Sequence, residues 1–256
     1  MSIAKSIQQH PIFKLGKKPA KRDRRNLSLK SILRAPVKTP DEYDFDTSHC
    51  GVPTPVYAND RLGDCVIAGR AHQTLRFELI EQRRVIPITD DEVVSEYLLE
   101  TGGPDIGLIV LDSLNRWRKR GWIAAGARYF ILAFAEIDRR NASQVKQAVF
   151  TELGIGLGVS LPMTAQREFE AGKPWTTIRG TGSEPGSWGG HYVYVTGYTS
   201  LGPTCVTWGR KQRMSWAFFA KYSDEAYAVI DALDTPKKQK ALNGSKIESF
   251  LRRLTP

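Results

Sequence analysis

Cysteine is scarce in this chain, whose 256 residues include three, at Cys50, Cys65 and Cys205. An odd and sparse set excludes a disulfide framework and a zinc site built from four cysteines. Long apolar runs are also missing, because no stretch approaches the ~20 consecutive apolar residues of a membrane span. The N-terminus lacks the apolar core of a secretory signal. We therefore expect no membrane contact and no secretion by a signal peptide.

Acidic residues are almost absent from residues 1–40, which hold eleven of the 37 lysines and arginines but one acidic residue, Asp23. Beyond residue 40 the two signs balance, so the formal net charge of +10 belongs to this basic N-terminal arm. The chain thus divides into an arm, 1–40, and a neutral domain, 41–256. We expect at most salt-sensitive, non-specific nucleic-acid contact, because the arm offers only Phe13 as a stacking group.

The periodicity of apolar residues changes along the domain, from helical spacing in the first half to alternation in the second. This order predicts an α+β fold with a helical lobe, a sheet lobe and a cleft between them. The expected helices span 65–83, 90–100, 107–120 and 142–153; the expected strands span 154–161, 191–198 and 204–208, followed by a turn-and-helix region over 215–233.

Cys65 is the candidate nucleophile, because it falls in the first turn of a predicted helix. Gly63 permits a tight turn, and Asp64 is a natural N-cap. Backbone N–H groups and the helix dipole at this position favour the thiolate, although a nearby Asp64 carboxylate opposes it. The alternative is that Cys65 is a small buried apolar residue, the commonest role of a lone cysteine.

His191 is the candidate base, because it follows Gly189 and Gly190 and opens a predicted strand. At the rim of a cleft its imidazole could reach a thiol of the other lobe. The alternative is a structural histidine at the start of the strand. The histidines, cysteines and carboxylates show no tight ligand spacing, so the sequence predicts no metal site and no cofactor.

The segment before Cys65 resembles that of papain-like cysteine peptidases. Tyr43-Asp44-Phe45 is followed by Val52-Pro53-Thr54-Pro55-Val56, then by Asn59, and Cys65 comes six residues after Asn59. In the family a glutamine stands at the place of Asn59. Its amide and the backbone N–H of the cysteine form the oxyanion hole.

The second half carries the same resemblance in the same order. Residues 189–198 are similar to the family's segment around its catalytic histidine, and 207–209 resemble its Asn-Ser-Trp-Gly. The likeness covers residues 41–230. It implies a papain-like two-lobed α+β fold with a helical lobe and an antiparallel sheet lobe. It further implies a peptide or protein substrate attacked by Cys65, with His191 as base and Asn59 in the oxyanion hole. We expect imidazole nitrogen and sulfur to lie ~3–4 Å apart.

One departure from the family leaves two functions open. The asparagine that orients the histidine is missing. By distance from His191 its place falls on Thr207, a weaker orienter, and by register on Trp208 it falls on Val206. The first hypothesis is an amide or peptide hydrolase with a Cys–His dyad. The second is a weakly active or inactive papain-like structural protein of an intracellular or phage (virion) assembly. With its basic arm and without a secretion signal, the chain also resembles proteins found in bacterial and phage genomes. We therefore expect a cytoplasmic or virion-associated location.

The arm is too poor in apolar residues to fold alone, so it stays ordered only against another surface. Ile12, Phe13 and Leu15 are its best anchors. Because the domain is neutral, we expect the Lys17–Arg25 run to contact other protein subunits. The alternative is that the arm occupies the cleft as an inhibitory segment.

Overall fold

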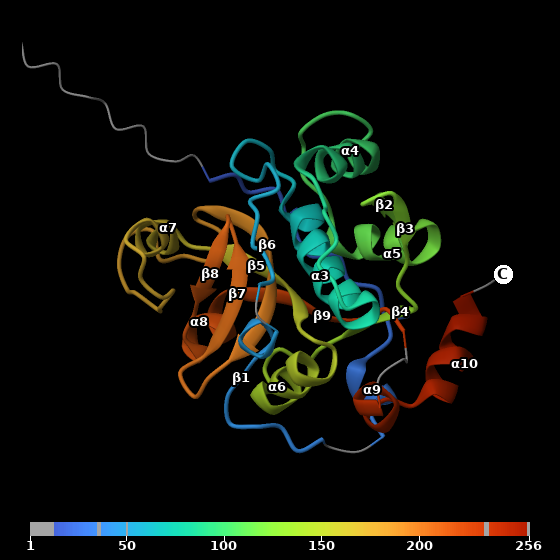
Figure 1. The fold of residues 1–256 in the computed structure, drawn as a ribbon. Coiled ribbons are helices and arrows are strands. Elements are labelled where there is room, and N and C mark those ends of the chain that lie inside the picture. Colours follow the sequence, from blue (N-terminus) through green and yellow to red (C-terminus); the bar gives the residue numbers. More distant parts are fainter. Residues whose placement is uncertain (1–12, 35–36, 50, 233–235, 255–256) are drawn as a thin grey trace, which may run out of the picture.

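A seven-stranded antiparallel sheet forms one side of the molecule, on the left in Figure 1. This structure is a computed structural model that describes residues 13–34, 37–49, 51–232 and 236–254. The strands pair in the order β4-β9-β5-β6-β7-β8, and β1 pairs with the end of β6. Their bounds are β1 (Tyr43–Asp44), β4 (Ala133–Glu136), β5 (Ile155–Leu161), β6 (Gly189–Tyr198), β7 (Pro203–Thr207), β8 (Arg210–Arg213) and β9 (Ser223–Ile230).

The helices α3, α4 and α5 form the other side, whereas α7 and α8 lie on the side of the sheet (Figure 1). The longest helix in the described ranges, α3, lies between the sheet and α4 and contacts both β6 and α4. A small hairpin of β2 and β3 follows α5. The bounds are α1 (Leu29–Ile32), α2 (Phe45–Ser48), α3 (Cys65–Gln82), α4 (Asp90–Thr101), α5 (Val110–Arg120), β2 (Trp122–Ala124), β3 (Ala127–Tyr129), α6 (Ala142–Thr151), α7 (Met163–Glu170), α8 (Trp216–Tyr222), α9 (Pro236–Ala241) and α10 (Gly244–Leu254).

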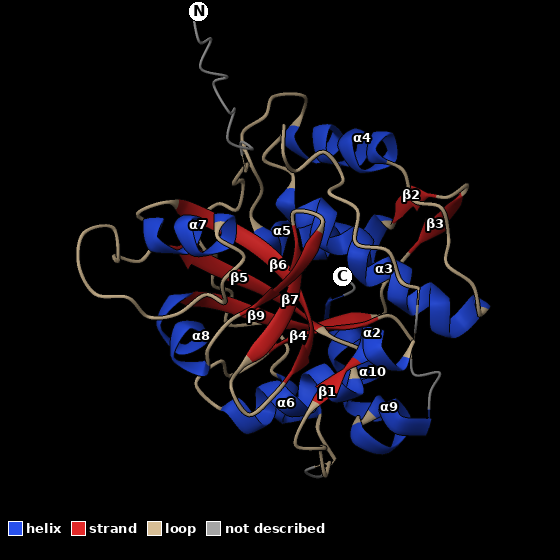
Figure 2. Ribbon diagram, turned by 60° about the vertical axis from the view of Figure 1, so that its left-hand side comes forward, coloured by secondary structure: helices blue, strands red, loops and turns tan. Residues whose placement is uncertain are grey.

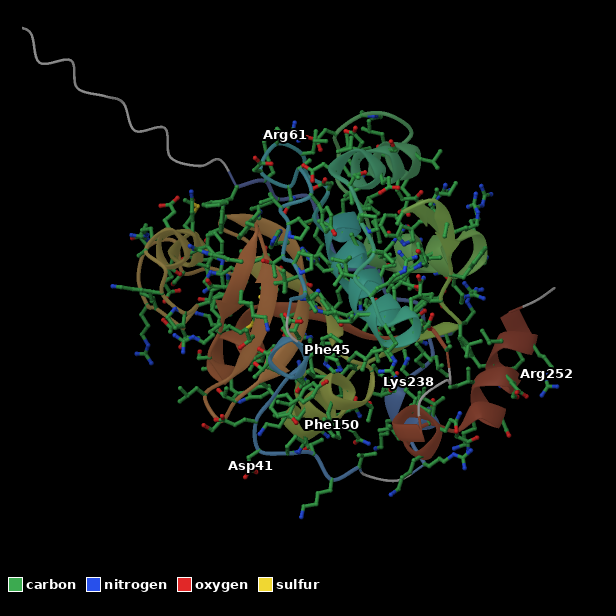
Figure 3. The ribbon with its side chains drawn as sticks, in the orientation of Figure 1. Asp41, Phe45, Arg61, Phe150, Lys238 and Arg252 are labelled. Atoms are coloured by element: carbon green, nitrogen blue, oxygen red, sulfur yellow. The ribbon has the colours of Figure 1, made fainter. Side chains whose placement is uncertain are left out.

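Each side has its own buried apolar cluster. The cluster of the helical side includes Phe77 and Trp117, and that of the sheet includes Val195 and Phe218. Figure 2 shows the same division, with β5, β6 and β7 on one side of α3 and the small hairpin of β2 and β3 on the other. In Figure 3 Phe45 lies inside the fold. The predicted two-lobed α+β architecture is confirmed. None of the helices in the described ranges is long and apolar enough to cross a membrane.

The helices begin and end close to where the local sequence predicts. Thr89 and Glu92 form a capping box at the start of α4, which fixes its first turn. The region expected as turn and helix over 215–233 differs, since only its first part is helical and Ser223–Ile230 is a central strand. Residues on both faces of β9 are buried, so the strand lacks the alternation of apolar and polar residues that would mark a half-exposed strand.

The described part of the N-terminal arm packs on the domain. In Figure 1 its dark-blue trace begins where the sheet and the start of α3 meet and ends at α1, beside α9. Leu29 and Ile32 are completely buried in the cluster of the sheet. The backbone N–H of Arg34 donates to Ala241. The division into an arm, 1–40, and a domain, 41–256, stays a prediction, and the described part of the arm lies on that domain. Ile12, one of the expected anchors, lies outside the described residues.

Candidate active site

Cys65 is the first residue of α3 and is 1% exposed. Arg61, labelled in Figure 3, lies in the loop that leads to it. Asp64 occupies the N-cap position as expected, but its side chain makes no capping hydrogen bond. Neither carboxyl oxygen of Asp64 has a hydrogen-bond partner in the described part of the chain. Burial raises the pKa of this carboxyl to about 8, with the Asn59 amide acting in the opposite direction.

His191 is held from two sides. Its Nε2 lies 2.7 Å from Thr207 Oγ1, and its ring stacks on Trp208 with centroids 4.0 Å apart and planes 11° from parallel. Thr207 is thus the neighbour that the spacing from His191 predicts. If Nε2 carries the proton and donates it to the threonine oxygen, Nδ1 has a free lone pair. Nδ1 has no hydrogen-bond partner among the residues described.

The thiol of Cys65 lies beside the residue that follows His191. The backbone N–H groups of Tyr192 and Gly16 act on the sulfur and favour its thiolate. Because Nδ1 is unpartnered, no hydrogen bond joins it to the sulfur within the described ranges. The separation of ~3–4 Å between imidazole nitrogen and sulfur stays a prediction. Gly16 of the arm also lies against the sulfur.

Asn59 is buried and near Asp64, but its amide is engaged within its own loop. Nδ2 donates to the carbonyl of Leu62 at 3.0 Å. One N–H of the amide is thus used within the loop, and the place of Asn59 in an oxyanion hole stays a prediction. The side chain is one methylene shorter than the glutamine of the papain-like family, and it reaches the nearer acceptor.

Residues 13–18 of the arm pass between the two lobes. Gly16 faces the helical side, where its carbonyl accepts from the N–H of Leu108 at 2.8 Å, and the N–H of Lys17 donates to Gly190 on the sheet at 3.1 Å. A Cβ on Gly16 would lie 1.6 Å from the oxygen of Gly63, so only glycine permits this approach. The segment passes close to both candidate groups, since the backbone N–H of Gly16 acts on the Cys65 sulfur and the Lys17 charge acts on His191.

The aromatic end of this segment lies on the ring that shields His191. Phe13 contacts Trp208 and Phe169, with centroids 5.1 Å and 4.8 Å apart. Nε1 of Trp208 donates to the carbonyl of Lys14 at 3.3 Å. Phe13 and Leu15 are thus anchors, as expected, but on the chain's own domain.

Lys17 itself points into the chain's own domain, whereas the contact of the Lys17–Arg25 run with another chain stays a prediction. The Lys17 side chain is 1% exposed, and Nζ lies 2.9 Å from Asp224 and 3.2 Å from Glu225. The domain is neutral as a whole, so its net charge does not reveal this local acidic pair. For that reason the net charge predicted no partner for Lys17 within the domain. The one signal in the sequence was the adjacency of Asp224 and Glu225 at the start of an apolar run.

Burial determines the protonation of the pair. It raises the pKa of the Cys65 thiol to about 12, and it lowers the pKa of His191 to about 3, with the Lys17 ammonium lowering it further. Both groups are therefore neutral near pH 7 in this state. No group of three or more His, Cys, Asp and Glu in the described part of the chain could hold a metal ion.

The fold is similar to solved cysteine proteases. Xylellain, a cysteine protease from Xylella fastidiosa, matches with a TM-score of 0.66 and 14% identity over 89% of this chain and 100% of its own. Procathepsin B S9 from Trypanosoma congolense matches with a TM-score of 0.58 and 9% identity, over 86% of this chain and 87% of its own. The bromelain protease from Ananas comosus matches with a TM-score of 0.53 and 16% identity, over 75% and 100%.

These similarities show that the chain has the papain-like fold, as its motifs predict. No family model and no curated protein matches it in sequence. The share of this chain matched by xylellain is larger than residues 41–256 alone can supply, so that match extends into the N-terminal arm.

Proposed function

We propose that this protein is a cysteine-dependent peptide hydrolase whose own residues 13–18 hold it latent. The observation that carries the proposal is the setting of His191, bonded to Thr207 and stacked on Trp208 beside the buried Cys65. A base that is oriented through one nitrogen and free at the other is the arrangement that nucleophilic catalysis requires.

The reaction follows from these groups. Once the cleft opens, His191 Nδ1 takes the thiol proton, and Cys65 Sγ bonds to the substrate carbonyl carbon. The backbone N–H of Cys65 stabilises the resulting oxyanion, and Asn59 contributes with whatever N–H its loop leaves free. His191 then gives the proton to the leaving amine as the C–N bond breaks. Water hydrolyses the thioester, which releases the acid and restores the thiol.

The direction of the arm explains why it blocks the cleft without being cleaved. His191 protonates the leaving amine, so the Trp208 side of Cys65 is the leaving-group side. The arm lies there with Phe13 and Lys14 and crosses to the other side with Lys17. A substrate chain runs the opposite way, because its acyl part precedes its leaving amine in the sequence and the leaving amine lies on the Trp208 side. Residues 13–18 are therefore bound in reverse.

The test is covalent labelling of the full chain by an epoxysuccinyl thiol probe, together with hydrolysis of a fluorogenic peptide. We expect slow labelling of the wild type, faster labelling of Lys17→Met, and none of Cys65→Ala. Hydrolysis by Lys17→Met should be abolished by a further His191→Ala change. Hydrolysis that survives Cys65→Ala, or a Lys17→Met protein that is neither labelled nor active, would contradict the proposal.

A second candidate is a papain-like protein that binds but does not cleave, in an intracellular or phage assembly. The engaged Asn59 amide favours it, because a site with one oxyanion donor less is a poor catalyst. Labelling of Cys65 without any peptide hydrolysis would support this second function over the first.

A further inference from the structure

A cavity of about 360 Å³ lies between the basic arm and the helical side of the molecule. Its walls come from residues 21–26 of the arm, from α5, from Phe134 of β4 and from Phe250 of α10, the helix at the outer edge of the molecule (Figure 1). These segments are far apart in the sequence, and none of them carries a group of the candidate active site. The cavity is therefore a separate feature, which exists only while this part of the arm lies on the domain.

Two of the four cationic side chains in these walls already have an acidic partner. Lys21 pairs with Asp112 of α5 at 2.8 Å, and Arg25 pairs with Asp23 at 2.7 Å. Each of these pairs is neutral as a whole. The net positive charge of the cavity therefore belongs to the other two cations, which stand in the last turn of α5.

Arg118 and Lys119 are these two cations. Nε of Arg118 is buried and has no hydrogen-bond partner in the part of the chain that the structure describes. Burial lowers the pKa of this guanidinium, and no carboxylate of the described ranges acts in the opposite direction. Lys119 is exposed and adds a second positive charge next to it in the sequence. A guanidinium that loses water without gaining a counter-charge is costly, so this part of the cavity favours an anion.

Apolar side chains form another part of the walls. Leu111 and Phe134 are at most 7% exposed, and the half-buried Phe250 packs against the apolar cluster of the sheet. Apolar surface close to cations suits an occupant that carries an apolar group beside its negative charge. A bare inorganic anion would leave this apolar surface uncovered.

We propose that this cavity binds an acidic segment of a partner protein. An aspartate or glutamate of that segment pairs with Arg118 and Lys119, and a neighbouring apolar side chain lies on Phe134 and Phe250. The inference does not rest on the proposed hydrolase function, because it uses no group of the cleft. It also states which surface would be covered by a subunit that contacts the Lys17–Arg25 run.

A protein segment fits these walls better than a nucleic acid does. Asp23 and Asp112 stand in the same walls as the cations. A nucleic-acid backbone carries a negative charge at every nucleotide, so it would bring phosphates close to these two carboxylates, and like charges in contact weaken binding. A peptide carries its carboxylates at few positions and can place them beside Arg118 alone.

The test uses the full-length Cys65→Ala protein, which lacks the candidate nucleophile, and an array of random dodecapeptides. We expect the bound peptides to be enriched in aspartate and glutamate and to contain a large apolar residue close to them. Fluorescence anisotropy then gives Kd for the peptide that binds most tightly. Arg118→Gln should raise this Kd by ~10–30-fold, because one partner of a half-buried ion pair is lost.

Two further variants separate the cavity from charge in general and from folding. Lys119→Gln changes an exposed side chain, so a Kd raised by ~2–5-fold supports the site even where Arg118→Gln fails to fold. Arg179→Gln removes the same charge from an exposed loop after α7 and should leave Kd unchanged.

Three results would overturn the proposal. The first is an array without acidic enrichment, and the second is a Kd that is the same in Arg118→Gln, Lys119→Gln and Arg179→Gln. The third is a single-stranded dodecanucleotide that binds more tightly than every peptide and loses affinity in Arg118→Gln, which would assign the cavity to nucleic acid.

Discussion

Replacing Lys17 by methionine should release residues 13–18 from the cleft while the rest of the fold stays intact. Methionine keeps the length and the apolar stem, so the change removes the charge alone. In the closed state it leaves Asp224 and Glu225 facing an apolar group, and removing one partner of a buried ion pair costs about 3–5 kcal/mol. The Asp224 side chain is 26% exposed, so the lower end of that range applies.

A loss of about 3 kcal/mol shifts the opening of the segment by ~10²-fold. The assay is the rate of Cys65 alkylation by iodoacetamide, followed by intact mass, under conditions where opening is fast and the rate reports its equilibrium. We expect Lys17→Met to react ~10² times faster than the wild type.

Lys21→Met is the matched control. Lys21 pairs with Asp112 at 2.8 Å, but both side chains are about half exposed (54% and 51%). Such surface pairs contribute up to about 1 kcal/mol, so alkylation should change by less than ~5-fold. Cys205, buried in β7, reports global opening. Equal rates for the two lysine variants, or a parallel rise at Cys205, would refute a locally docked segment.

Four further predictions concern the site and the fold. Thr207→Val should lower kcat of the opened enzyme by ~5–30-fold, because a hydrogen bond to His191 is lost; an unchanged kcat would exclude an orienting role. Asn59→Ala should cost less than the ~10²–10³-fold of a dedicated oxyanion donor, since its amide is partly engaged; a larger loss of kcat would contradict this. Asp64→Asn should raise the free energy of unfolding at pH 7 by up to about 4 kcal/mol, since a raised pKa destabilises the ionised form, and the gain should vanish below pH 4. In that variant, denaturant titrations from pH 7 to 5 should show the free energy of unfolding fall by about 2 kcal/mol for each of His72 and His191. The pKa of each is lowered in the folded chain, so only the unfolded chain takes up these protons. An unfolding free energy that does not change with pH would show that neither histidine is buried in its neutral form.

The elements were predictable where their signals are local. The step of three and four residues after Cys65 gives α3 almost to its end, and the cap at Thr89 gives the start of α4. The strand Ser223–Ile230 was missed because it is buried on both faces and follows a real helix, so no period of two marks it. The central position of β9 follows from pairing with distant strands, which no local pattern records.

The sequence predicts which residues form the candidate site, but not the hydrogen bonds of Asn59 or the docking of Lys17 beside it. The spacing from His191 identified Thr207, and the helix start identified Cys65. The direction of the Asn59 amide depends on which acceptor lies within reach of a short side chain. Lys17 pairs with Asp224 and Glu225, which are 207 and 208 positions away, because a bulge between β5 and β9 turns both carboxylates to one side. A count of charges averages over such arrangements and cannot reveal them.

The arm affects reactivity through solvation as well as through steric exclusion. Burial under residues 13–18 favours the neutral forms of both Cys65 and His191, and the Lys17 charge favours the thiolate while opposing the imidazolium. Departure of the arm readmits water, which lowers the thiol pKa and raises the imidazole pKa. Loss of the Lys17 charge adds to the rise at the imidazole and opposes a smaller part of the fall at the thiol. The apparent affinity of a substrate equals its intrinsic affinity multiplied by the fraction of open molecules. Latency therefore depends on the ion pairs of Lys17 with Asp224 and Glu225, and a change at either carboxylate must alter the apparent affinity for every substrate.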